Sequence, residues 1–198
     1  MAREYSLFFC IKPRTMQTLK GITLQITVFC LALSSAAAAE IKGPVMGPVI
    51  EQYGPVVEVP DAYELLKGVP YGVVLDVASS PENQSELNRG IESAARFLNM
   101  SVRAGADVSD LQVAVVLHGD AAKDALDNES YRSRYQTDNP NDGLLSALKE
   151  AGVAIYLCGQ SAGFRGIQPG ELHPAITMAT SAMTVHTRLQ AEGWSVIP

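Results

Sequence analysis

Three short, unbroken apolar runs constrain the fold of this chain more than any other feature. They occupy residues 71–77, 111–117 and 153–157 and contain almost no charge. Runs of this length and composition are typical of strands buried on both faces of a parallel sheet. Apolar residues recur at helical spacing between them, over 87–102 and 144–151. Strands that alternate with helices predict right-handed crossovers and a doubly wound α/β domain.

The remaining elements are weaker signals. Residues 176–179 predict a short fourth strand, although 170–192 also fits one long helix. A helix over 181–192 and a last strand at 194–197 follow. Asn139 and Pro140 have the residue types of a helix cap and a first helical position, so we expect a helix to begin there. The sum is a single domain with a five-stranded, mostly parallel sheet and helices on both faces.

The first 39 residues have the layout of a secretory signal peptide. Basic residues precede an apolar run over 22–33, and four alanines close the segment at 36–39. The run is shorter than the about 20 apolar residues that span a membrane. We therefore expect cleavage after Ala39 and a periplasmic or secreted protein with no membrane segment after cleavage. An uncleaved anchor is the alternative reading, and Met16 is an alternative start.

Cleavage would leave an acidic chain with one cysteine. Residues 40–198 contain 11 basic and 20 acidic side chains, a net charge of −9, which disfavours nucleic acid as a partner. Gly-Pro-Val occurs three times within 40–68, and proline excludes a helix or an inner strand there. We expect an extended arm over 40–68 that either wanders or lies across the domain or a neighbouring subunit. The α/β domain then covers 69–198.

Chemistry is expected at the carboxyl ends of the strands. Cys158 ends the third run, and Gly159 and a stretch that can begin a short helix follow it. Backbone N–H groups at such a start, together with Arg165, would favour the thiolate. His118 ends the second run on the same edge, where it would act as a base or bind an anion. The plainer readings are a buried core cysteine and a turn histidine.

Other polar residues have plainer expected roles. Asp76 and Asp120 have the positions of turn or cap residues, and His173 and His186 are expected at the surface or on a helix face. One cysteine and three scattered histidines show no metal-ligand spacing, and no phosphate- or dinucleotide-binding motif is present. We therefore expect no metal and no cofactor.

Residues 155–166 read Ile-Tyr-Leu-Cys-Gly-Gln-Ser-Ala-Gly-Phe-Arg-Gly. This segment is similar to the cysteine segment of the DsrE/DsrF-like family, in which a small residue follows the cysteine at +3 and Arg-Gly at +7 and +8. Ser161, Arg165 and Gly166 occupy these places. The segments at 50–55, 115–119, 138–141 and 181–183 resemble signal-peptide-bearing members of the same family. The resemblance implies a five-stranded subunit that forms homo-oligomers or mixed oligomers.

The resemblance also implies a role for the cysteine. In the sulfur-relay members the matching cysteine carries sulfur as a persulfide between partner proteins, so this sulfurtransferase-like role falls on Cys158. We expect Gly159, Ser161, Arg165 and Gly119 to line the site around it. Two other functions remain open: a non-catalytic oligomer that binds a small anion or sulfur species, and a structural or interaction subunit with the cysteine in its core.

Overall fold

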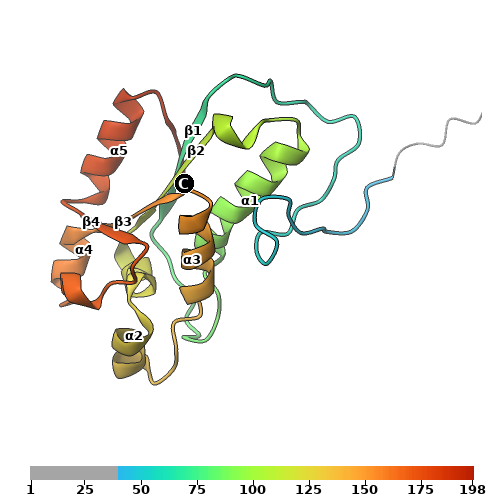
Figure 1. Ribbon diagram of the computed structural model, residues 1–198. Helices are drawn as coiled ribbons and strands as arrows, with labels where there is room; N and C mark the ends of the chain where they lie inside the picture. The colour runs from blue at the N-terminus through green and yellow to red at the C-terminus, as the bar shows by residue number, and fades with distance from the viewer. Residues whose placement is uncertain (1–39) are drawn as a thin grey trace, which may run out of the picture. The chain divides into compact units, whose positions relative to one another are not determined.

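The apolar runs form neighbouring strands of a five-stranded parallel sheet (Figure 1). The computed structural model describes residues 40–198. Its strands are β1 (Tyr71–Val77), β2 (Leu111–Leu117), β3 (Ala154–Cys158), β4 (Ile176–Ala179) and β5 (Ser195–Ile197). They lie in the order β4-β3-β2-β1-β5, and every neighbouring pair is parallel. The predicted α/β class with a five-stranded sheet is confirmed.

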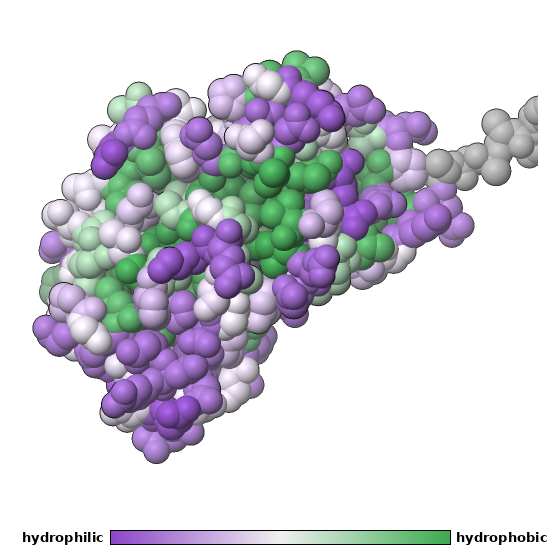
Figure 2. Space-filling view, viewed as in Figure 1, coloured by the Kyte–Doolittle hydropathy of each residue, from purple (hydrophilic) through white to green (hydrophobic). Residues whose placement is uncertain are grey.

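Helices cover both faces of the sheet (Figure 1). One face carries α1 (Arg89–Arg103) and α3 (Asp142–Glu150), and the other carries α5 (Ala182–Ala191). The connections contain α2 (Asn128–Tyr135), α4 (Gly159–Phe164) and 3₁₀ turns at Val108–Asp110, Gly119–Ala125 and Pro169–Glu171. Hydrophilic side chains cover α2, in keeping with its place at the periphery (Figure 2).

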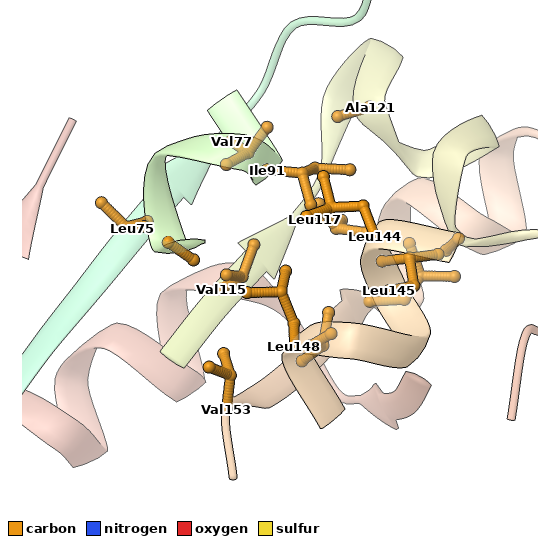
Figure 3. Packing of buried hydrophobic residues seen from close by; sticks show 14 of the residues in the cluster. Leu75, Val77, Ile91, Val115, Leu117, Ala121, Leu144, Leu145, Leu148 and Val153 are labelled. Carbon is orange, nitrogen blue, oxygen red and sulfur yellow. The ribbon is translucent and has the colours of Figure 1, made fainter. Parts of the chain in front are cut away.

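Alternation of side chains along the strands divides the core into two layers. Leu75 and Val77 of β1 belong to the layer under α1 and α3, whereas Val74 belongs to the layer under α5. In the larger layer Ile91 of α1 and Leu148 of α3 pack against β1 and β2 (Figure 3). Full burial of each such side chain contributes about 1.5–3 kcal/mol. Cys158 belongs to the smaller layer, beneath α5.

The Pro/Gly-rich segment lies across α1. Asn99 of α1 is fully buried and makes five hydrogen bonds to this segment. Its side-chain oxygen accepts from the N–H groups of Val49 and Ile50 at 3.0 and 2.9 Å. Its amide nitrogen donates to three carbonyls between Ile50 and Gly54, each at 3.0 Å. One side chain therefore provides hydrogen-bond partners for peptide groups that would otherwise remain unpaired, because these residues do not belong to a β-sheet.

Of two expectations about local structure, the short fourth strand is confirmed and the start of one helix is wrong. Residues 176–179 form a strand rather than part of a long helix, because Pro174 cannot donate a helical hydrogen bond. The helix expected to begin at Pro140, with Asn139 as its cap, instead begins at Asp142 with Asn141 as its cap, so that prediction is wrong by two residues. The Asn139 amide donates to the carbonyls of Asp124 and Leu126, which holds it in the preceding loop.

The predicted signal peptide, residues 1–39, lies outside the described residues. Within residues 40–198, no helix is both long and apolar enough to cross a membrane.

Candidate functional site

A pocket of about 240 Å³ lies at the carboxyl ends of β1, β2 and β3, beside the start of α5. The residues that line it come from each of these elements and from the turn into α4: Asp76, His118, Cys158, Gln160, Ser181, Ala182, Met183 and His186. Sites of open parallel sheets lie at this edge, so the pocket has the expected place in the fold.

The sheet register brings the polar residues to one face. Leu117 of β2 pairs with Leu157 of β3, so His118 and Cys158 follow side by side on neighbouring strands. Asp76 lies two residues after Val74 along β1, so both side chains face the α5 layer. The convergence therefore follows from strand order and from the twofold alternation of side chains.

Cys158 lies at the bottom of the pocket and is only 5% exposed. Burial raises the pKa of its thiol, but hydrogen bonding from the Ser161 N–H and hydroxyl and from the N–H groups of Ala182 and Gln160 outweighs burial. The pKa of Cys158 is therefore lowered from its ordinary value. The expectation of an exposed thiol is wrong, because α4 and the start of α5 cover the end of β3.

Ser161 links the cysteine to the end of β2. Its hydroxyl oxygen accepts a hydrogen bond from the Gly119 N–H at 3.0 Å. A hydroxyl that accepts in this way keeps its own proton for another partner. The Gly119 N–H thus orients the Ser161 hydroxyl so that it donates toward the Cys158 sulfur.

The two glycines expected at the site permit close backbone approaches. A Cβ on Gly159 would lie 2.6 Å from the Ala179 carbonyl oxygen. Gly119 has a φ of +52°, and a Cβ there would lie 2.8 Å from the Ala78 carbonyl oxygen. Both residues therefore bring turns against neighbouring strand ends, which any larger side chain would obstruct.

Arg165 does not face the thiol. Its guanidinium pairs with Asp120 at the surface, and it is not among the groups that shift the pKa of Cys158. The expectation that Arg165 stabilises the thiolate is therefore wrong, whereas Asp120 lies in the first turn of the 3₁₀ helix after β2, as its reading as a turn or cap residue predicts. The ion pair joins the end of α4 to the turn after β2 instead.

Sequence reasoning missed a carboxylate flanked by two imidazoles. Asp76 Oδ1 lies 2.9 Å from His118 Nε2 and 3.2 Å from His186 Nε2. All three atoms are shielded from solvent, and none has an aligned hydrogen-bond partner within residues 40–198. They are held together as close polar contacts at the wall of the pocket. His186 was expected at the surface or on a helix face; it does lie on a helix, α5, but nothing in the sequence indicated that this face meets Asp76.

His173, expected at the surface or on a helix face, is instead buried in the loop before β4, and it lies in a different pocket of about 470 Å³. Its Nδ1 accepts from the Ala175 N–H at 3.1 Å, and its Nε2 lies 3.3 Å from the Ser146 hydroxyl. Burial lowers the pKa of this imidazole. Its contacts tie α3 to the loop before β4, and it takes no part in the pocket around Cys158.

Within residues 40–198, no group of three or more histidine, cysteine or acidic side chains is arranged to hold a metal ion.

Comparison with known proteins shows which family the chain belongs to. No curated protein matches it. Among solved structures, it resembles a protein of unknown function, MTH1491 from Methanobacterium thermoautotrophicum, with 19% identity and a TM-score of 0.48 over 64% of this chain and 97% of that chain. It also resembles the ychN protein from E. coli, with 17% identity and a TM-score of 0.46 over 64% of this chain and 96% of that chain. The family model for the DsrE/DsrF-like family matches residues 72–198. This match covers more than half of the sequence and includes the whole sheet except the first residue of β1, so the chain belongs to the DsrE/DsrF-like family.

Proposed function

We propose that this protein is a sulfur carrier that holds sulfur as a persulfide on Cys158. The observation that carries the proposal is the set of donors around the sulfur: three backbone N–H groups and the Ser161 hydroxyl lower the pKa of a thiol that lies almost buried at the bottom of a pocket. The thiolate is the nucleophilic form of cysteine. A cysteine that served only as packing would have no need of this donor set.

The proposed reaction is a transfer of sulfane sulfur without net oxidation. The Cys158 thiolate attacks the outer sulfur of a donor persulfide, R–S–SH, and a new S–S bond forms at Sγ. The S–S bond of the donor breaks, and its inner sulfur leaves with the electron pair as R–S⁻, which then takes a proton. A second thiolate, from an acceptor, removes the sulfur by the same reaction in the opposite sense.

We further propose that the protein works outside the cytoplasm, as a homo-oligomer that exchanges sulfur with a protein partner. The apolar run and the alanines before residue 40 support export. Exposed apolar side chains support association: Met183, which lines the pocket, is 75% exposed, and Phe164, at the end of α4, is 93% exposed. Intact mass of the native protein and light scattering at micromolar concentration test these two points.

The test of the function is a mass measurement. The protein is mixed with glutathione persulfide, and the Cys158 peptide is expected to gain one sulfur atom and to lose it when an acceptor thiol is added. Cys158→Ser should gain none. If the wild-type peptide gains no sulfur although iodoacetamide labels it in the native state, the site binds a small ligand without carrying sulfur. If iodoacetamide labels it only after denaturation, the cysteine is packing.

A further inference from the structure

Two sets of polar groups lie at the pocket, and only one of them acts on the Cys158 sulfur. Every group that lowers the pKa of Cys158 comes from the turn into α4 or from the start of α5. Neither His118 nor His186 is among them, although both line the pocket. The donors therefore account for the lowered pKa of the nucleophile, and the two histidines do not contribute to it.

The reaction has a second requirement that the donors around Cys158 do not meet. When a thiolate attacks a persulfide or a disulfide, the departing sulfur carries the electron pair away as a thiolate. A weakly acidic thiol departs slowly unless a proton reaches it as the bond breaks. Apart from Cys158, the titratable groups that line the pocket are Asp76, His118 and His186, since Gln160, Ser181, Ala182 and Met183 hold no exchangeable proton of suitable acidity.

Asp76 lies against the Nε2 atom of both imidazoles. Its shielded Oδ1 lies within 3.2 Å of both Nε2 atoms, although neither Nε2–H is aligned for a hydrogen bond to it. The Nδ1 atom of His118 is not among the shielded atoms and has no partner within residues 40–198. A carboxylate that orients an imidazole in this way leaves the other nitrogen free to exchange a proton with substrate. The contacts are imperfectly aligned here, as is common before a substrate binds.

The sheet favours His118 over His186 for this task. His118 follows β2 directly beside the end of β3, whereas His186 reaches the pocket from α5. We propose that His118 is the general acid that protonates the sulfur leaving from the donor, that Asp76 is its positioning residue, and that the site accordingly accepts donors whose leaving thiols are poorly acidic. This inference rests on the proposed attack by Cys158.

The proton and electron balance is simple. The Cys158 electron pair forms the new S–S bond, the donor S–S bond breaks, and the leaving sulfur takes a proton from Nδ1 of the His118 imidazolium, which becomes the neutral imidazole. Solvent returns a proton to His118 afterwards. No oxidant or reductant is consumed.

The experiment compares leaving groups on the full chain, with the Cys158 peptide followed by mass spectrometry. Three reagents are used: iodoacetamide, whose iodide needs no proton; the aromatic disulfide dithiobis(nitrobenzoate), whose thiol is strongly acidic; and bis(hydroxyethyl) disulfide, whose thiol is weakly acidic. The variants are His118→Gln, His186→Gln and Asp76→Asn. The control is Asp120→Asn, which removes an exposed carboxylate in the turn after β2 that pairs with Arg165 and does not line the pocket.

We expect His118→Gln to slow the reaction with bis(hydroxyethyl) disulfide about 100-fold, and to change the reactions with the other two reagents less than about threefold. Asp76→Asn should reproduce this selective loss and shift the imidazole nitrogen signals of His118 in NMR spectra toward the other tautomer. Equal slowing with all three reagents, or none, overturns the inference. A selective loss in His186→Gln alone overturns the assignment to His118. If wild-type Cys158 reacts with no reagent, the proposed function itself fails.

Discussion

Replacing Ser161 by alanine tests the physical cause of the thiol's acidity. The change removes a hydroxyl that donates to the Cys158 sulfur and leaves the backbone donors in place. A hydrogen bond to a charged group contributes about 1.5–3 kcal/mol. At a pH below the titration midpoint, this loss reduces the thiolate population about 10- to 100-fold.

The expected change in rate is smaller than the change in population. A more basic thiolate is a stronger nucleophile, with a Brønsted coefficient of about 0.4–0.5, which recovers almost half of the loss on a logarithmic scale. Alkylation of Ser161→Ala by iodoacetamide should therefore be about 4- to 15-fold slower below the midpoint. At high pH, where both proteins are fully ionised, the variant should react faster than the wild type.

The assay is the rate of iodoacetamide labelling at the Cys158 peptide across a pH series. Ser93→Ala is the matched control, because its hydroxyl donates only to the Arg89 carbonyl within α1. Thermal unfolding of both variants checks that the fold is intact. A labelling profile for Ser161→Ala that superimposes on the wild type would refute the reasoning. Burial and the backbone N–H groups would then account for the pKa of the thiol without the Ser161 hydroxyl.

Three further predictions concern stability. Gly159→Ala places a Cβ 2.6 Å from the Ala179 carbonyl oxygen, so we expect urea unfolding to show a loss of about 1–3 kcal/mol; an unchanged midpoint would contradict the close approach. Asn99→Ala leaves the peptide groups of the arm unpaired, so we expect a loss of about 2–3 kcal/mol and faster proteolysis within 45–56; equal protease resistance would show that other contacts hold the arm. Burial raises the pKa of Asp124, so its contribution to stability is present below the ordinary value of 3.8 and is lost as pH rises through the raised pKa. Unfolding of Asp124→Asn across pH should lack this decline, and an identical decline would assign it to another group.

Several features of the site were accessible from the sequence because they are local. The strands at 71–77, 111–117 and 176–179 coincide with those in the structure. A strand buried on both faces needs an uninterrupted apolar run whatever its partners are. The position of Cys158 at the end of such a run, followed by Gly159 and a short helix, is a property of one continuous segment.

The errors share a different cause. Arg165 was expected near the thiol because it is close in sequence, but the end of α4 directs it to Asp120. Asp76 and His186 were given plain roles because nothing local relates them. Their meeting at His118 depends on β1 lying beside β2 and on α5 packing over both.

The sequence by itself determined the alternation of strands and helices, the edge of the sheet that holds the site, and the cysteine within it. These follow from side-chain periodicity and from backbone constraints that act over a few residues. The tertiary structure alone decided how far Cys158 is buried, which donors reach its sulfur, and that Asp76, His118 and His186 converge. Those properties depend on strand order and on the packing of α5 over the strand ends, and contacts between segments distant in the chain leave no periodic signal in the sequence.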